Sequence, residues 1–216
     1  MEQGAAPVDP RARATAPTER GAAPREGGAG AQRGGPERGP VPALRTDRLR
    51  LVAPSAAAWD AYRRFYTDGE ASRMYGGPLS ESGAWARLAS DLGTWHLGEV
   101  GVWAIERADD GETVGVCGFW QGRGWPRELT WWLLPEARGQ GLALEASKAV
   151  LRQAYDGFGW TSVETYMTDD NHAARALVLR LGGEKIGRPV FPDGEARDLY
   201  RLPRSMELVR SRGPDA

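Results

Sequence analysis

The chain is 216 residues long, has 28 Lys and Arg residues against 29 Asp and Glu residues, and carries a formal net charge of −1. This length usually corresponds to one domain, and the near-neutral charge argues against a general nucleic-acid-binding protein or a protein that binds anionic membranes. Cys117 is the only cysteine, so an intrachain disulfide is excluded and a reducing compartment, the cytoplasm, is expected.

Two terminal segments differ in composition from the body of the chain. Residues 1–43 are dominated by Ala, Gly, Pro and Arg, and the first aromatic residue of the chain is Trp59. Such a segment buries too little apolar surface to offset the entropy lost on ordering, so we predict a disordered tail. The short polar segment 206–216 is predicted to be a frayed end. The domain is therefore expected at residues 44–205, which contain all nine Trp residues.

The first half of this body shows strand, helix and hairpin patterns. Residues 46–52 alternate polar and apolar side chains, as a half-buried strand does. Ser55 is a candidate N-cap for a helix with an aromatic face, and Ser80 begins a second helix. Residues 102–106 and 113–120 flank an Asp-Asp-Gly turn and predict a β-hairpin.

In the second half, strands alternate with helices. We predict strands at 128–134, 162–167, 184–190 and 197–202, and helices at 141–157 and 171–181. A hairpin region followed by alternating strands and helices is typical of an α+β or mixed α/β sheet with helices packed on it.

The turn after the strand at 128–134 indicates an anion-binding site. Residues 138–143 read RGQGLA and fit the pattern Arg/Gln-x-x-Gly-x-Gly/Ala. The first amides of a helix have no intrahelical partner, and the helix dipole makes that end partly positive. Gly141 has no Cβ, so phosphate oxygens can approach the backbone closely. The turn therefore predicts a pyrophosphate site, while the turn alone leaves open that it binds nothing.

A second signature follows the strand at 162–167, where the chain reads TDDNHAARALVLRLGG. Asn171 is the only asparagine of the chain. One interpretation is a helix N-cap. The other is a ligand contact, because a side-chain amide both donates and accepts hydrogen bonds, as a peptide-like ligand arm requires.

These motifs give the chain a resemblance to the GNAT superfamily of acyl-CoA-dependent N-acetyltransferases. It looks most like the branch that includes the ribosomal-protein N-terminal alanine and serine acetyltransferases. The resemblance covers about residues 44–204 and rests on TDRLRL, GVWAIE, ELTWWLLPEARGQGLALEA and TDDNHAARALVLRLGG, in that order. It implies a GNAT-like acyl-CoA N-acyltransferase fold, in which a splayed central sheet is flanked by helices.

The resemblance also implies a cosubstrate and its site. Acetyl-CoA would place its pyrophosphate against the amides of residues 139–143 and its pantetheine arm along residues 131–134, with Asn171 near the sulfur. The residues assigned to this cofactor are Trp132, Leu133, Leu134, Arg138, Gly139, Gln140, Gly141, Leu142, Ala143 and Asn171. The acceptor would be a primary amine, either a protein N-terminus or a small molecule, and a homodimer stays open.

Acetyl transfer to an amine needs an unprotonated nitrogen, a thioester held in line and a donor for the oxyanion. Glu128 is the candidate general base and Glu164 the second choice, although Glu128 at the start of a strand could equally lie in solvent. Many GNAT enzymes have a tyrosine as general acid where this chain has Val178, which leaves Tyr200 and Tyr166 as weak substitutes. A non-catalytic acyl-CoA-binding module therefore stays open as the alternative.

Other kinds of site are not indicated. His96 and His172 are the only histidines and are too far apart in the sequence to suggest a metal site, so we predict none. The sequence lacks a nucleotide-binding GxxxxGK[ST] motif, an apolar stretch long enough to span a bilayer and a hydrophobic N-terminal region resembling a signal peptide. The Trp residues at 85, 95, 103, 120 and 125 would either line an acceptor pocket or fill the core and a dimer face.

Overall fold

The computed structural model describes residues 41–98 and 100–204, so residues 1–40 of the tail predicted at 1–43, and the tail predicted at 206–216, lie outside the described residues. Residues 41–43, which the composition assigned to the N-terminal tail, contact the domain. Val41 packs against the main hydrophobic cluster, and Trp103 donates a hydrogen bond of 2.6 Å from Nε1 to the carbonyl of Pro42. The contacts of the domain therefore begin ahead of the boundary predicted at residue 44.

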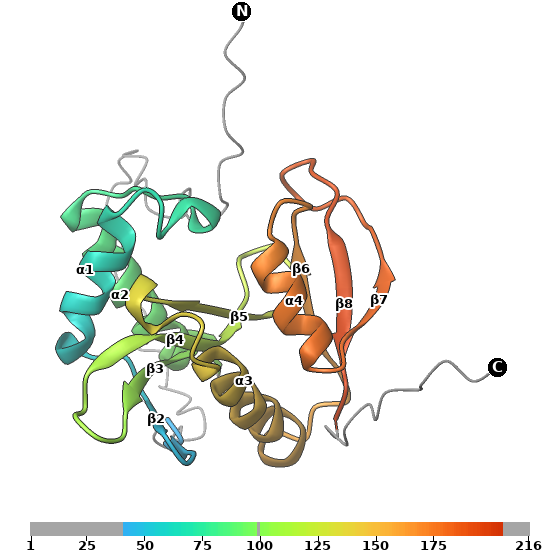
Figure 1. Cartoon of the computed structure of the whole chain (residues 1–216). Coiled ribbons are helices and arrows are strands. Elements are labelled where there is room, and N and C mark those ends of the chain that lie inside the picture. The colour runs from blue at the N-terminus through green and yellow to red at the C-terminus, as the bar shows by residue number, and fades with distance from the viewer. Residues whose placement is uncertain (1–40, 99, 205–216) are drawn as a thin grey trace, which may run out of the picture.

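Two antiparallel sheets form the framework (Figure 1). The first has the strand order β1 (Leu44–Arg45), β2 (Leu49–Val52), β3 (Val102–Arg107), β4 (Thr113–Trp120) and β5 (Glu128–Leu133). The second has the order β6 (Val163–Met167), β8 (Asp198–Leu202) and β7 (Glu184–Gly187). The predicted strands and the hairpin of β3 and β4 are confirmed, and the mixed α/β class is confirmed with them.

Four α-helices cover the sheets: α1 (Trp59–Thr67), α2 (Glu81–Gly98), α3 (Leu142–Arg152) and α4 (His172–Arg180). Short turns of helix precede or follow them at η2 (Ala56–Ala58), η3 (Arg73–Tyr75), η4 (Pro135–Ala137) and η5 (Gln153–Gly157). Both predicted serine caps form, since Ser55 Oγ accepts from the amide of Ala57 and Ser80 Oγ from that of Gly83. Within 41–98 and 100–204, no helix combines the length and the apolar character needed to cross a bilayer.

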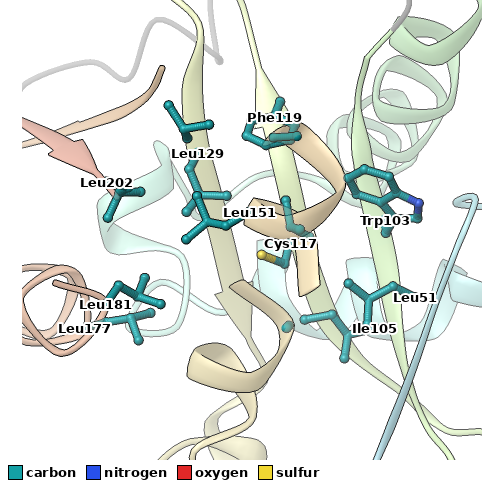
Figure 2. Packing of buried hydrophobic residues seen from close by; sticks show 14 of the residues in the cluster. Leu51, Trp103, Ile105, Cys117, Phe119, Leu129, Leu151, Leu177, Leu181 and Leu202 are labelled. Carbon is teal, nitrogen blue, oxygen red and sulfur yellow. The ribbon is translucent and has the colours of Figure 1, made fainter. Parts of the chain in front are cut away.

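The two faces of β5 pack against different layers. Leu129 and Leu133 belong to the main cluster with α3, whereas Trp132 and Leu134 belong to a second cluster with α1 and α2. Figure 2 shows Leu202 of β8, Leu177 of α4 and Leu181, which follows α4, near Leu129 in the main cluster. One continuous core therefore holds the second sheet against the first.

Strands β5 and β6 are neighbours in space but belong to different sheets. One hydrogen bond of 2.9 Å, from Thr165 Oγ1 on β6 to the carbonyl of Leu129 on β5, joins them near the start of β5. Beyond that point Figure 1 shows the two sheets diverging, with α3 and α4 on either side of the opening. The splayed sheet that the family resemblance implied is therefore present.

A buried carboxylate fixes α4 to the second sheet. The Asp198 side chain is 5% exposed and lies 2.7 Å from Lys185 Nζ, 2.8 Å from Arg188 Nη1 and 3.4 Å from Arg175 Nη2 of α4. The hydrogen bond from Lys185 lowers the pKa of Asp198, burial opposes that effect, and the hydrogen bond from Arg188 adds to it. Asp198 therefore stays ionised in the folded protein at pH values where a free carboxyl is protonated.

This lowered pKa predicts an acid-dependent loss of stability. Because the unfolded chain binds the proton more readily, the stabilisation is present above the ordinary Asp pKa of about 3.9 and is lost as pH falls through the lower folded value. We expect Asp198→Asn to remove this part of the pH dependence, as measured by urea unfolding between about pH 5 and 2. Asp110→Asn, in an exposed turn, is the control and should retain the pH dependence of stability that Asp198 causes. Parallel curves for parent and Asp198→Asn would contradict the assignment.

Candidate functional site

A cavity of about 550 Å³ lies between the end of β5 and helices α3 and α4. Its walls come from the end of β5, the turn that follows, the first residues of α3, the N-terminal part of α4 and the segment around η3. This volume is in the range of small-molecule sites, and clefts between sheets and helix starts are common places for them.

The predicted anion-binding turn opens onto this cavity. Gly139 and Gly141 have φ values of 75° and 79°, the left-handed region that favours glycine. Gly141 is the N-cap of α3, and no side chain of this cap bonds to the helix start. Gly141, Leu142 and Ala143 all line the cavity. The partly positive end of α3 is therefore directed at a space that a ligand can enter.

Arg138 and Gln140 hold the shape of the turn. The Arg138 guanidinium donates from Nε to the carbonyl of Leu133 and from Nη2 to that of Ala71, both at 3.1 Å. Arg138 also lines the cavity. Gln140 is absent from the cavity lining, and its side chain donates to the carbonyl of Glu136 at 2.8 Å. The side chain of Gln140 therefore has a role within the turn, and its contact with a cofactor stays a prediction.

Glu145, an acidic residue in the first turn of α3, is neutralised by residues of the turn between β1 and β2. Glu145 accepts hydrogen bonds from Thr46 Oγ1 at 2.6 Å and from Arg48 Nε at 2.7 Å. Burial acts to raise the pKa of Glu145, but the bonds from Thr46 and Arg48 outweigh it and lower the pKa. Arg48 also donates from Nη1 to the carbonyl of Gln140 at 3.0 Å. The carboxylate is thus compensated next to the predicted pyrophosphate site.

The free edge of β5 forms another wall. Leu134 donates its amide to the carbonyl of Val114, and the register of β4 and β5 pairs Trp132 with Val116. Because successive residues of a strand direct their backbone groups to opposite edges, the groups of Trp131 and Leu133 face the opening. Their carbonyls accept from Tyr75 Oη and Arg138 Nε, respectively.

The alternation of backbone directions along β5 bears on two of the predicted cofactor residues. The backbone groups of Trp132 and Leu134, expected to bond the pantetheine arm, are directed to β4. Trp132 still lines the cavity through its side chain, as does Leu133, while Leu134 is buried and is absent from the lining. The pairing of β5 with β4 decides which backbone groups of β5 point away from β4. The sequence does not reveal this choice, because the two adjacent Trp residues show no alternation of polar and apolar side chains.

Asn171 has one of the two roles that the sequence left open, the helix N-cap, and its contact with a ligand stays a prediction. Its Oδ1 accepts from the amide of Ala174 at 3.1 Å, which makes it the N-cap of α4. It also lines the cavity, next to Asp170 and His172. The cap uses only the Oδ1 acceptor of Asn171 and fixes the orientation of its side chain. The N–H donors of Nδ2 take no part in the cap.

The two candidate catalytic residues do not reach the cavity. Glu128 and Tyr200 are only 4% and 5% exposed, and both are absent from its lining. Glu128 is therefore neither the solvated strand end nor a group placed to take a proton from a ligand here. Tyr200 lies on β8 opposite Thr165 and Lys185, in the main cluster. The burial of both side chains leaves these two catalytic assignments without support from the structure.

The remaining candidates also fall outside the cavity. Val178 is fully buried in the main cluster, so the usual tyrosine position is a core position here. Burial raises the pKa of the Cys117 thiol to about 12, which argues against a nucleophilic cysteine. None of the five Trp residues considered for an acceptor pocket appears in the lining. The described part of the chain contains no group of three or more His, Cys, Asp or Glu side chains arranged to hold a metal ion.

Sequence reasoning missed several residues of the cavity wall. They come from η3 and α4 and include Arg73, Tyr75 and Arg180. Arg73 Nη1 lies 3.3 Å from Asp170 Oδ2, so the η3 segment is tied to the start of α4 across the opening. Arg180 lies within the recognised TDDNHAARALVLRLGG motif, whereas Arg73 and Tyr75 come from a segment with no local signal.

Comparison with known proteins gives consistent matches. The family model described as an acetyltransferase (GNAT) domain matches residues 48–184. YoaA of Bacillus subtilis (strain 168), named an uncharacterized N-acetyltransferase, is 28% identical over 150 residues, which cover 68% of this chain and 85% of YoaA. The crystal structure of an acetyltransferase from Agrobacterium tumefaciens str. C58 aligns with a TM-score of 0.67 and 28% identity, covering 76% of this chain and 96% of that one.

A more distant structure includes a ligand. The microcin C7 self-immunity acetyltransferase MccE, solved in complex with acetyl-CoA and AMP, aligns with a TM-score of 0.57 and 15% identity. The alignment covers 72% of this chain and 92% of that one. At this identity the likeness concerns the fold.

Proposed function

Because the chain belongs to the GNAT family of acetyltransferases, we propose that it transfers an acetyl group from acetyl-CoA to a primary amine by direct attack in a ternary complex. The observation that carries this proposal is a single cavity bounded by the open edge of β5 and the uncapped start of α3. One wall suits an extended amide-containing arm and the other suits a diphosphate.

The proposed position of the cosubstrate follows from these two walls. The pyrophosphate lies against the amides of Leu142 and Ala143, with Gly139 and Gly141 allowing close approach. The pantetheine arm runs back along β5 past Leu133 to Trp131 and meets Asn171 on the opposite side. That MccE, which shares the fold, was solved with acetyl-CoA supports this choice of donor.

Several groups of the cavity serve binding and orientation in this proposal. The amides of α3 hold the diphosphate, and the edge of β5 holds the arm so that the thioester carbonyl has one orientation. Such positioning removes entropy from the reaction step before it occurs. The acceptor nitrogen must arrive unprotonated, which is easier for an α-amine, with a pKa of about 8, than for a lysine amine, with a pKa of about 10.4.

We propose a protein N-terminus or a small primary amine as the acceptor. The resemblance of the sequence to the ribosomal-protein alanine and serine acetyltransferases supports the first. The near-neutral body does not favour a strongly charged acceptor of either sign, so a panel should include peptides with N-terminal Ala or Ser as well as amino acid esters.

Binding of the cosubstrate can be tested without knowing the acceptor. A ligand at 100 times its dissociation constant stabilises the folded state by about 2.7 kcal/mol. For a domain of this size we expect a rise in melting temperature of about 5–10 °C with acetyl-CoA or CoA, measured by calorimetry. Pantetheine, which lacks the diphosphate, is the matched control and should produce a much smaller shift. An unchanged melting temperature with CoA would refute the proposed site.

A second candidate function is a non-catalytic acyl-CoA-binding module. The observation that favours it is Val178, which is buried and stands at the position where many GNAT enzymes have the tyrosine that acts as general acid. Release of free thiol from acetyl-CoA over the amine panel separates the two functions. An enzyme releases one thiol for each amine acetylated. A binding module shows the thermal shift without any amine-dependent thiol.

A further inference from the structure

Tyr75 is held in a fixed position at the open edge of β5. It ends η3, and its amide donates to the carbonyl of Ser72 at 2.7 Å. Ser72 is fully buried and donates from Oγ to the carbonyl of Asp68 at 2.6 Å. The amide of Leu79 donates to the carbonyl of Tyr66 at 2.7 Å, which ties the end of this segment back to α1.

The segment is also attached to both sides of the cavity. Arg138 of the anion-binding turn donates to the carbonyl of Ala71, and Arg73 pairs with Asp170 at the start of α4. The Tyr75 ring packs edge-on against Phe65, with 5.4 Å between the ring centroids. A side chain placed by this many contacts is oriented before any ligand arrives, as a catalytic group requires.

The hydroxyl of Tyr75 lies where the arm of the cosubstrate would end. It donates to the carbonyl of Trp131, one of the two outward-facing positions of β5 inside the cavity. An arm that comes from α3 passes Leu133 first and Trp131 next. An amide N–H of the arm can take over the Trp131 carbonyl, and the Tyr75 hydroxyl, still adjacent, can then donate to the neighbouring sulfur.

We propose that Tyr75 is the proton donor to the departing thiolate. This inference rests on the proposed acetyl transfer and supplies the group that Val178 cannot provide. The amine nitrogen forms a bond to the thioester carbonyl carbon, and the carbon–sulfur bond breaks with its electron pair going to sulfur. The sulfur takes the proton from Tyr75 Oη. The phenolate then recovers a proton from solvent, which has accepted the proton lost by the amine nitrogen.

The bound CoA thiol reports this contact without an acceptor. A hydrogen bond from Tyr75 to sulfur stabilises the thiolate, so removing it in Tyr75→Phe should raise the pKa of the bound thiol by about one unit. The thiolate is followed by its ultraviolet absorbance as the difference between the CoA and desulfo-CoA complexes. Tyr200→Phe, which removes a hydroxyl outside the cavity, is the matched control. Other titratable or charged groups of the wall stay in place: Glu70, Arg73, Arg138, Asp170, His172 and Arg180.

Kinetics then test the proton transfer itself. With the best amine of the panel, single-turnover transfer by Tyr75→Phe should be about 10²-fold slower, at unchanged CoA affinity and with a smaller solvent isotope effect. Two results for Tyr75→Phe would overturn the proposed role. One is that both the transfer rate and the pKa of the bound thiol are unchanged. The other is that CoA binds more weakly while the transfer rate of the bound complex is unchanged. Absence of any thiol release by the parent protein would instead refute the proposed function, and the inference with it.

Discussion

Replacing Gly141 with Val is expected to weaken acetyl-CoA binding by more than about 100-fold, as measured by calorimetric titration. Gly141 has a φ of 79°, and a β-branched residue is an outlier in that region of backbone space. Relaxing that strain turns the amides of Leu142 and Ala143 away from the ligand, and the new side chain fills the space where phosphate oxygens would approach. Both effects remove the proposed diphosphate contact.

A substitution at a second glycine distinguishes an effect on acetyl-CoA binding from an effect on stability. Gly111, in the turn between β3 and β4, has a φ of 76°, and a Cβ built there meets no atom within 4 Å. Gly111→Val therefore carries a comparable backbone strain far from the cavity. It should lower the melting temperature and leave the affinity for acetyl-CoA intact. Retained affinity in Gly141→Val would show that the cosubstrate binds elsewhere.

Replacing Trp132 with Ala is expected to destabilise the fold by about 3–5 kcal/mol, the range for deleting a buried aromatic side chain. Trp132 is 4% exposed and stacks on Phe65 with 4.2 Å between ring centroids. It also meets Tyr62 edge-on at 5.1 Å. Its Nε1 has no hydrogen-bond partner within the described ranges, so the loss is one of packing alone. For a domain of this size the melting temperature should fall by about 10 °C or more.

Trp85→Ala is the matched control for this variant. Trp85 is 50% exposed and contacts Trp59 edge-on at 5.4 Å, so its loss should cost about 1 kcal/mol. Urea unfolding of the two variants gives the comparison directly. Equal destabilisation would show that Trp132 is not a central part of the wall that separates the cavity from α1 and α2.

The elements of the fold were predictable because their signals are local. Ser55 and Ser80 begin the helices that their cap positions indicated, and the Asp-Asp-Gly turn joins the expected hairpin. Asn171 occupies the N-cap position that one reading gave it. In each case the determining interaction is formed within a few residues, so the sequence pattern contains it.

The missing parts of the site depend on contacts distant in sequence. Tyr75 bonds to Trp131, fifty-six positions further along the chain, and no motif marks it. Glu128 lies at the start of the expected strand, but its side chain is only 4% exposed, and burial by tertiary packing is not encoded in a strand pattern. Likewise, the outward direction of Trp131 rather than Trp132 is set by the pairing of β5 with β4.

The bond from Thr165 to Leu129 limits how deep the opening between the sheets can be. It joins the strands two residues beyond Trp131, which corresponds to about 7 Å along β5. An acyl chain that follows the strand direction would meet this closed point within that length. Discrimination between short and long acyl donors would then depend on the bond between the Thr165 side chain and the backbone of β5.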